Sequence, residues 1–283
     1  MVIFLLEYGS LFMNEFELEK IVSFITEKIG IIPLESHKSG IGKFIEKKIK
    51  AIGSFRNYFL KIQSDTNELE ELVNGSTVNE TYFFREEKQF DLLKQRFFPE
   101  WINRNGTKPI KIWSAACSEG AEAYSLLLLA SSCHVKSEIL ASDINTAVLK
   151  KCRSGVFKAS LLRPGDGEKY RYLVQKYINQ NGEIEFDETM RSKIATKRIN
   201  LAKIEKEKSI IEKQDIIFVR NVFIYFSRET RAKILKVLSE NYLADGGIIF
   251  VSMNEIAQVD SSMTPEGLRK ISDGDVFYFV KTK

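Results

Sequence analysis

The stretch that decides the fold is Ile110-Lys-Ile-Trp-Ser-Ala-Ala-Cys-Ser-Glu-Gly-Ala-Glu-Ala-Tyr-Ser125, which continues into a leucine-rich run. An apolar strand ends at small residues, one glycine lets the backbone turn, and a helix begins. Glu138-Ile-Leu-Ala-Ser-Asp143 is then typical of a second buried strand that ends in a carboxylate. In a doubly wound parallel sheet, the carboxyl ends of neighbouring strands border a ligand crevice. The stretch therefore predicts an α/β domain with a Rossmann-like sheet.

The carboxylate of Asp143 is placed to accept hydrogen bonds from both hydroxyls of a ribose. The chain has no Gly-x-Gly-x-x-Gly and no Walker lysine, so nothing predicts a pyrophosphate cradle beside it. A nucleoside cofactor without phosphates, such as S-adenosylmethionine (SAM), therefore fits better than a dinucleotide. The alternative is that Asp143 is a helix N-cap, which leaves the buried strand before it unexplained.

Composition narrows the class of protein. The 283 residues are 44% hydrophobic and 28% charged, which is ordinary for a globular protein, and the net charge of +4 does not indicate nucleic-acid binding. Three cysteines without a Cys-x-x-Cys pair, and two histidines without suitably spaced partners, predict neither a disulfide framework nor a metal site. No apolar run reaches about 18 residues, so we expect no membrane insertion and a cytoplasmic protein.

The N-terminal part of the chain is predicted to be helical. Apolar residues recur at helical spacing from Phe16 to Ile29 and stop at Gly30, and a basic helix ends at Gly53. Ser54 is the expected N-cap of the next helix. The first twelve residues lack the basic region and long apolar run of a signal peptide. We expect translation to begin at the second methionine, Met13. A further short helix is expected at 69–73.

The domain boundary is expected after a longer helix from Thr81 to about Trp101. The polar turn Asn103–Pro109 follows, which predicts a helical domain over 13–103 and an α/β domain over 104–283. Within the second domain, Asn181-Gly182 predicts a hairpin in a small antiparallel β-insertion at about 160–198. Further elements are expected as helices at 146–154 and 228–243, strands at 215–219 and 248–253, a turn at 245–247, and a last edge strand at 275–281.

Four segments carry a family pattern: Asn79-Glu-Thr-Tyr-Phe-Phe-Arg-Glu86, Ser114–Ser125, Ala141–Phe157 and Arg220-Asn-Val-Phe-Ile-Tyr-Phe226. In this order they resemble the CheR family of chemotaxis receptor methyltransferases, over nearly the whole chain from about Met13. The resemblance implies a small helical N-terminal domain and a SAM-dependent methyltransferase domain with an antiparallel subdomain inserted after its second strand. It also implies methyl transfer from SAM to glutamate side chains of chemoreceptor cytoplasmic domains, with S-adenosylhomocysteine as product.

The resemblance also implies the residues that contact the cofactor. Glu122 is expected at the cationic methionine end of SAM, although a carboxylate at a helix start is also favoured by the helix dipole. Arg85 follows two phenylalanines that would anchor its helix, and its planar fork suits the cofactor carboxylate. Asn79 and Thr81 are expected to add polar contacts to the cofactor, and helix capping before Phe83 is a nearly as good explanation that is compatible with this role. The full set of implied cofactor-binding residues is Asn79, Thr81, Arg85, Glu122, Asp143, Asn200, Leu201, Val219 and Arg220.

Arg220 and Tyr225 are the expected catalytic residues. An arginine and a tyrosine at a strand end can steer a carboxylate substrate, whereas Tyr225 can instead simply pack on Phe223 and Phe226. No general base is required, because a glutamate with a pKa of about 4.3 is already ionised at neutral pH. Catalysis would then consist mostly of alignment in a dry site.

The basic helix carries Lys43, Lys47, Lys48 and Lys50. By resemblance it docks on acidic receptor helices, with lysines in place of the family's arginines and Phe44 where an arginine is usual. Its alternative is a plain solvated face. We expect a monomer that acts on methyl-accepting receptors.

Two other functions compete with this one. A degenerate SAM-binding sensor or scaffold remains open, because Glu119, Ala121 and Ala123 depart from the family's cofactor loop. Ser252-Met-Asn-Glu255 likewise replaces the family's usual Gly-His-Ser-Glu. Retention of Arg85, Glu122, Asp143, Arg220 and Tyr225 argues against it. A small-molecule methyltransferase is disfavoured by the N-terminal helices and the insertion.

Overall fold

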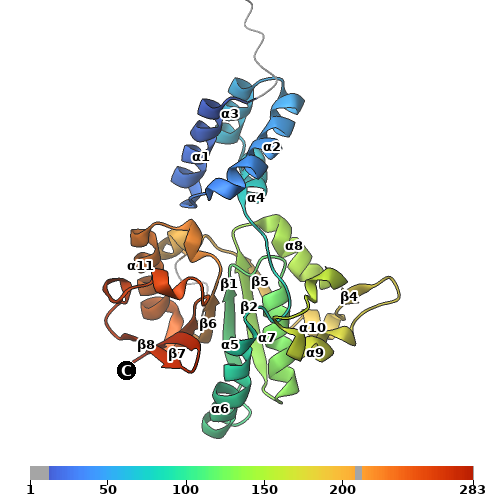
Figure 1. Ribbon diagram of the computed structural model, residues 1–283, viewed down its shortest axis with the longest axis vertical. Helices are drawn as coiled ribbons and strands as arrows, with labels where there is room; N and C mark the ends of the chain where they lie inside the picture. Colours follow the sequence, from blue (N-terminus) through green and yellow to red (C-terminus); the bar gives the residue numbers. More distant parts are fainter. Residues whose placement is uncertain (1–12, 208–211, 283) are drawn as a thin grey trace, which may run out of the picture. The chain divides into compact units, whose positions relative to one another are not determined.

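The computed structural model describes residues 13–207 and 212–282. The chain forms two compact units, Met1–Val78 and Asn79–Lys283, which are described separately (Figure 1). Residues 1–12, which precede the expected start at Met13, lie outside the described residues. No helix in the described ranges is long and apolar enough to cross a membrane.

The described part of the first unit consists of α1 (Glu15–Ile29), α2 (Glu35–Ile52), α3 (Phe55–Ser64) and α4 (Thr66–Ser76). The expected helix ends are confirmed: Gly30 and Gly53 have φ of 76° and 103°, the left-handed region that glycine adopts without strain. The Ser54 side chain caps α3 by accepting from the Asn57 amide. Apolar side chains from all four helices form the core, with Ile21, Ile45, Tyr58 and Leu72 fully buried.

The division between the units falls after Val78, whereas the sequence predicts it near residue 103. The structure assigns α5 (Glu87–Leu92), a π-helical turn (Leu93–Phe97) and α6 (Phe98–Asn105) to the second unit. The reason is packing: Phe90 is fully buried, and its ring centroid lies 5.9 Å from that of Phe218. The apolar faces of these helices therefore belong to the core of the α/β domain.

The predicted helix from Thr81 begins later than expected. Phe84 and Glu86 have φ of 58° and 59°, and the helix starts only at Glu87. A left-handed residue cannot continue a right-handed α-helix, so residues 81–86 form a turn instead. Arg85 thus lies on an irregular segment and not on a helix face.

The second unit is built on a seven-stranded sheet with the order β5-β2-β1-β6-β7-β9-β8. Its strands are β1 (Ile110–Ala115), β2 (Ser137–Asp143), β5 (Ile194–Arg198), β6 (Gln214–Val219), β7 (Leu243–Phe250), β8 (Leu268–Asp273) and β9 (Val276–Lys281). The first five strands in the sheet order are parallel, and β9 pairs antiparallel with both β7 and β8. Figure 1 shows α7 (Ala121–Ser132) and α8 (Thr146–Ser154) beside β2, and α11 (Arg228–Val237) on the other side. The predicted Rossmann-like methyltransferase architecture is confirmed.

Three details of the predicted sheet are wrong. The strand at 276–281 is not an edge strand, because β8 covers its outer side. The sequence does not predict the two edge strands, β5 and β8. Their sequences, Ile-Ala-Thr-Lys-Arg and Leu-Arg-Lys-Ile-Ser-Asp, are rich in polar residues, which a half-exposed edge strand tolerates. The expected turn at 245–247 lies inside β7, where pairing with β6 jumps from Leu243 to Ile248.

A small antiparallel sheet lies between α8 and β5. It consists of β3 (Val156–Lys158) and β4 (Glu183–Glu185), followed by the short helix α10 (Glu188–Arg191), with α9 (Arg171–Gln175) between the strands. The predicted hairpin is present, because Ile178 bridges Ile184 across the turn at Gly182. The predicted insertion at 160–198 is displaced, since β3 precedes it and its last five residues form β5 of the large sheet.

Candidate functional site

The site begins where β1, β2 and β6 end together. Their registers place Ala115 beside Ser142 of β2 and beside Val219 of β6. The chain then turns at Gly120, whose φ is 102° and whose Cβ, if present, would lie 2.5 Å from the Cys152 sulfur. Only glycine fits this turn, which brings the start of α7 close to the strand ends.

Asp143 lies at the tip of β2, against this loop. Its carboxylate accepts hydrogen bonds from the backbone amides of Ser118 and Asn145, both at 2.9 Å. Burial raises the pKa of Asp143, while these backbone hydrogen bonds oppose the rise. The alternative interpretation as a helix cap is wrong, because Asn145 caps α8 through its own side chain.

The buried Arg220 and the partly buried Glu122 form an ion pair across the strand ends. The Nε of Arg220 lies 2.7 Å from Oε2 of Glu122, and the Ser114 hydroxyl donates to Oε1 at 2.6 Å. The Arg220 Nη1 also donates to the Arg85 carbonyl at 2.8 Å and to the Gln89 side chain at 3.0 Å. Arg220 is 5% exposed. Its hydrogen bonds join the end of β6 to α7, to Arg85 and to α5.

Residues 79–86 are held against the same edge by backbone contacts. The Phe84 amide donates to the Ser125 hydroxyl, and the Ser118 hydroxyl donates to the Asn79 carbonyl. Thr81 is buried. Arg85 is half-buried, with its Nη1 3.3 Å from the Glu80 carbonyl, so its carbonyl and its guanidinium have separate partners.

Asp166 of the insertion holds residues 82–87 in place. The sequence does not predict this role. Its carboxylate accepts from the amides of Glu86 and Glu87, at 2.7 and 2.9 Å, and from the Tyr82 hydroxyl at 2.7 Å. Burial alone would raise the pKa of Asp166, but these hydrogen bonds hold it below its ordinary value. The insertion therefore fixes the start of α5 as well as its own fold. The turn sequence Pro-Gly-Asp-Gly was the available signal.

Asn200 and Leu201 follow β5 at the same edge of the sheet. The β5 register pairs Arg198 with Asp143, and the Ile199 amide donates to the Asp143 carbonyl at 3.0 Å. The Asn200 side chain accepts from the Ala202 amide at 3.0 Å, as a cap of the next turn, and Leu201 is buried. Both residues thus directly follow the backbone contact between Ile199 and Asp143.

Tyr225 lies in a short turn after β6. Phe223 and Phe226 on either side are buried, at 0% and 4% exposure, whereas Tyr225 is half-buried. Burial raises its pKa, and the neighbouring Glu255 and Glu80 add to the rise. The two phenylalanines supply the core packing here, so the tyrosine is not required for it.

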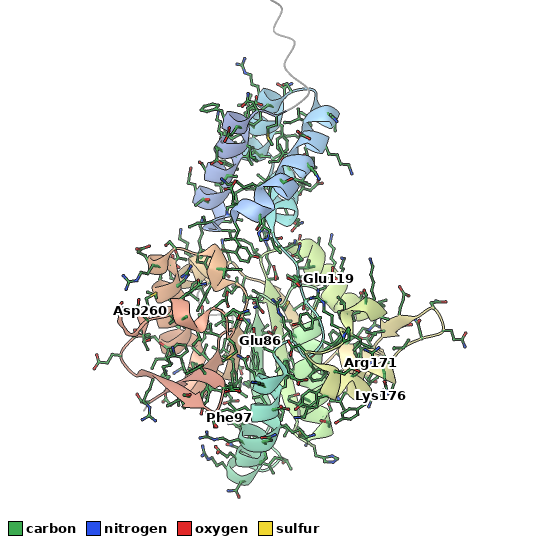
Figure 2. The ribbon with its side chains drawn as sticks, in the orientation of Figure 1. Glu86, Phe97, Glu119, Arg171, Lys176 and Asp260 are labelled. Carbon is green, nitrogen blue, oxygen red and sulfur yellow. The ribbon has the colours of Figure 1, made fainter. Side chains whose placement is uncertain are left out.

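The three residues that depart from the family's cofactor loop contact α8 or the core. Glu119, labelled in Figure 2, forms an ion pair with Lys151 on α8. Ala121 and Ala123 are fully buried in the first turn of α7. The substituted positions therefore face α8 or the core, while Glu122 faces Arg220.

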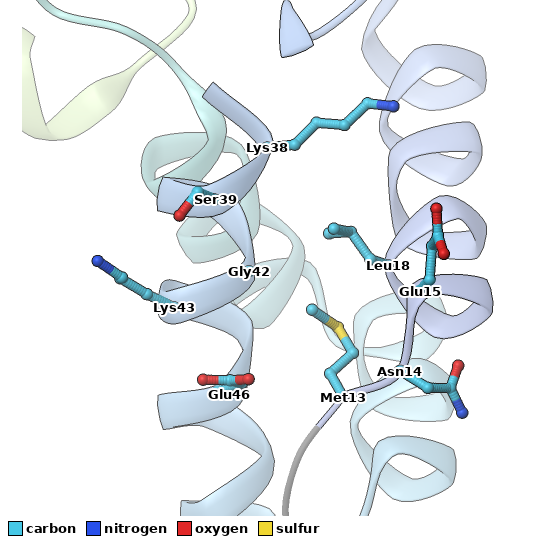
Figure 3. Close-up of a pocket in the computed structure, with 9 residues that line it drawn as sticks. All are labelled: Met13, Asn14, Glu15, Leu18, Lys38, Ser39, Gly42, Lys43 and Glu46. Atoms are coloured by element: carbon cyan, nitrogen blue, oxygen red, sulfur yellow. The ribbon is translucent and has the colours of Figure 1, made fainter. Parts of the chain in front are cut away.

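The basic helix α2 presents its lysines differently. Lys43, Lys47 and Lys50 are exposed, and Figure 3 shows Lys43 extending away from α1 beside a hollow between the two helices. Lys48 is half-buried instead, with its Nζ 2.7 Å from Glu68, a buried residue of α4. Lys48 therefore holds the helical unit together and is not part of an open docking face.

The described side chains, residues 13–207 and 212–282, contain no group of three or more His, Cys, Asp and Glu that could hold a metal ion. Separate carboxylates and guanidinium groups lie around the strand ends. Asp143, Glu122 and Arg85 offer acceptors for hydroxyl and ammonium groups and a donor for a carboxylate, which fits SAM.

Comparison with known proteins gives the family. The model of the CheR methyltransferase SAM-binding domain matches residues 79–268. A chemotaxis protein methyltransferase of Borreliella burgdorferi is 30% identical over 254 residues, covering 84% of this chain and 87% of that protein. Chemotaxis protein methyltransferase 1 of Pseudomonas aeruginosa is 32% identical over 258 residues, covering 85% and 89%. The chain therefore belongs to the CheR methyltransferase family.

Proposed function

We propose that this protein methylates glutamate side chains on the cytoplasmic domains of chemoreceptors, with SAM as methyl donor and S-adenosylhomocysteine as product. The observation that carries the proposal is the meeting of Asp143, the Glu122–Arg220 pair and the loop of Tyr225 at adjoining strand ends. The relatives' printed names, chemotaxis protein methyltransferases, support the chemoreceptor as substrate.

The cofactor residues divide by chemistry. We assign Asp143 to the ribose hydroxyls, Glu122 and Arg85 to the methionine end, and Asn200 with Leu201 to adenine. Asn79, Thr81 and Val219 border the same place through backbone and apolar contacts. When bound, SAM supplies an electrophilic methyl group.

The protein's own task is then positioning. A receptor glutamate is ionised at neutral pH, so the site has to align its oxygen and exclude water. Tyr225 supplies a hydroxyl for that alignment. Arg220, being buried and paired with Glu122, acts chiefly by holding the loop and Glu122 in place, although it was expected to touch the substrate.

For docking, we assign the exposed Lys43, Lys47 and Lys50 of α2 to acidic receptor helices, with the protein acting as a monomer. Exposed lysines contribute long-range attraction that salt screens, and Lys48 contributes through the stability of the helical unit.

The test is incubation with tritiated SAM and receptor-containing membranes. Base-labile label on receptor-sized bands supports the proposal. Tight SAM binding without label on any receptor favours a sensor or scaffold of the same family.

A further inference from the structure

Glu255 is a buried carboxylate that holds the loop carrying Tyr225. It is 1% exposed and lies after β7, in the segment Ser252-Met-Asn-Glu255. Its Oε2 accepts from the Asn221 amide at 2.6 Å, and its Oε1 accepts from the Ile224 amide at 3.1 Å. Both donors belong to the turn between β6 and Tyr225.

The same segment reaches the other side of the site. The Ser252 hydroxyl accepts from the Asn221 side-chain amide at 2.9 Å and donates to the carboxylate of Glu86. Glu86 also accepts from the Met253 amide at 3.0 Å and lies 3.7 Å from Arg220. A continuous network therefore joins residues 79–86 to the loop after β6.

Two residues of this network occupy the left-handed region of the backbone, Asn221 with φ of 54° and Glu86 with φ of 59°. Such conformations cost free energy for residues with a side chain and persist where surrounding contacts enforce them. At Asn221 the contacts come from Glu255 and Ser252, on the backbone and side chain respectively.

We propose that Glu255 is a positioning residue for methyl transfer, which fixes the 221–225 loop and thereby the hydroxyl of Tyr225. The proposal rests on the proposed function. A carboxylate accepting on both oxygens is a stronger and more rigid anchor than a neutral acceptor. Loss of its hydrogen bond to the Asn221 amide should increase the mobility of the loop at this left-handed residue.

The charge of Glu255 changes near neutral pH. Burial raises its pKa from 4.5 to about 7, opposed by the backbone donors of Ile224, Asn221 and Phe223, and the charge of Glu86 adds to the rise. Tyr225 of the loop also interacts electrostatically with Glu255, and Arg220 lies 3.7 Å from Glu86. Protonation converts one acceptor oxygen into a hydroxyl, which weakens the hold on one amide. Turnover should therefore rise as pH rises through about 7.

Stability should change in the opposite direction. Because the pKa in the folded protein lies above the ordinary value, ionisation of Glu255 costs folding free energy. Its stabilising contribution is complete below pH of about 4.5 and is lost as pH rises toward 7. A rate that increases through about pH 7, together with a stability that decreases between about pH 4.5 and 7, identifies an ionised anchor.

The test is Glu255→Gln, which keeps the shape of the side chain and removes the charge. We expect kcat at pH 8 to fall about 10-fold, with the receptor KM and SAM affinity changed less than about 2-fold. The rise of kcat between pH 6 and 8 should disappear, and hydrogen exchange at the Asn221 and Ile224 amides should accelerate. Glu255→Asp, which keeps the charge, should retain part of the pH-dependent rise.

Asp215→Asn is the matched control. Asp215 is also a carboxylate whose pKa is raised by burial, and it accepts the Lys111 amide at 2.9 Å at the opposite end of β6. This variant removes a partly buried carboxylate at the opposite end of β6 and should leave the pH-dependent rise in kcat intact. An unchanged rate and pH profile in Glu255→Gln would overturn the proposal. If the wild type methylates no receptor, the proposed function fails, and unchanged amide exchange in Glu255→Gln would still overturn the positioning role.

Discussion

Arg220 at the end of β6 and Glu122 in the first turn of α7 form an ion pair with 2.7 Å between Nε and Oε2, and the Arg220 side chain is 2% exposed. Both are expected at the ligand site from the sequence, and the structure shows that they also pair with each other. A carboxylate and a guanidinium in such a setting hold one another in a fixed orientation. The pair therefore couples the cofactor side of the site to the loop where methyl transfer is proposed.

Removal of one partner should be costly. Arg220→Met leaves the Glu122 carboxylate without its cation in a largely dry place, so we expect the free energy of unfolding to fall by about 3–5 kcal/mol. Urea denaturation followed by circular dichroism measures this. Arg228→Met is the control, because that exposed arginine pairs with Asp260 at 2.8 Å and should cost less than about 1 kcal/mol. Equal losses in the two variants would contradict this role of the ion pair.

Asp143→Ala should weaken binding of both SAM and S-adenosylhomocysteine by about 2–4 kcal/mol, through loss of two charge-assisted hydrogen bonds to the ribose. Isothermal calorimetry on the folded variant measures the change. Because Asp143 also accepts from the Ser118 amide, thermal unfolding must show that the Asp143→Ala variant remains folded. Unchanged affinity would remove the ribose assignment.

Binding should also depend on pH through Asp143. Burial raises its pKa above the ordinary aspartate pKa of about 3.9. The ionised carboxylate, which accepts the ribose hydrogen bonds, is therefore lost at a higher pH than for an exposed aspartate. Affinity for S-adenosylhomocysteine should thus decline on acidification at a higher pH than an ordinary aspartate would cause. Calorimetry at a series of pH values tests this, and Asp143→Asn should be flat over the same range. A wild-type profile as flat as the variant's would contradict the assignment.

The exposed lysines of α2 predict a docking defect without a cofactor defect. Lys43→Glu with Lys47→Glu should slow receptor methylation and leave SAM affinity intact, and raised salt should partly mimic the loss. Lys48→Met serves as the contrast, because breaking its contact with Glu68 should lower the stability of the helical unit. Full activity in the variant with both charges reversed would show that these lysines of α2 are solvated and do not dock the receptor.

Tyr225→Phe removes one hydroxyl and keeps the ring. If the hydroxyl orients the substrate carboxylate, turnover should fall roughly 10- to 100-fold, about 1.4–2.7 kcal/mol of transition-state stabilisation. Initial rates at saturating SAM measure it, with SAM affinity as the internal control. A wild-type rate would leave Tyr225 without this role.

Local patterns predicted the parts of the fold that local physics controls. The strand–glycine–helix sequence around Gly120 gave the centre of the sheet and placed Asp143 at its edge, because buried parallel strands are nearly continuous apolar runs. The polar edge strand β5 lacks that pattern, so it was assigned to the insertion. The helix expected from Thr81 failed because Asp166, 80 residues from Glu86, enforces a turn there.

The site followed the same division. Motif residues such as Glu122 and Arg220 were predicted singly, but their pairing depends on two strand ends meeting. Glu255 had no local signal of burial, since one acidic residue in a polar segment is ordinarily exposed. Its role follows only from the folded position of the Asn221 and Ile224 amides.

The proposed reaction is esterification of receptor glutamates with the methyl group of SAM. The most direct measurement is mass spectrometry of a receptor cytoplasmic fragment after incubation with deuteromethyl-labelled SAM and the wild-type protein. We expect labelled methyl esters on glutamate side chains that mild base removes, and strongly reduced labelling with Asp143→Ala. Label on another residue type, or a wild type that binds SAM and labels no receptor fragment, would contradict the claim.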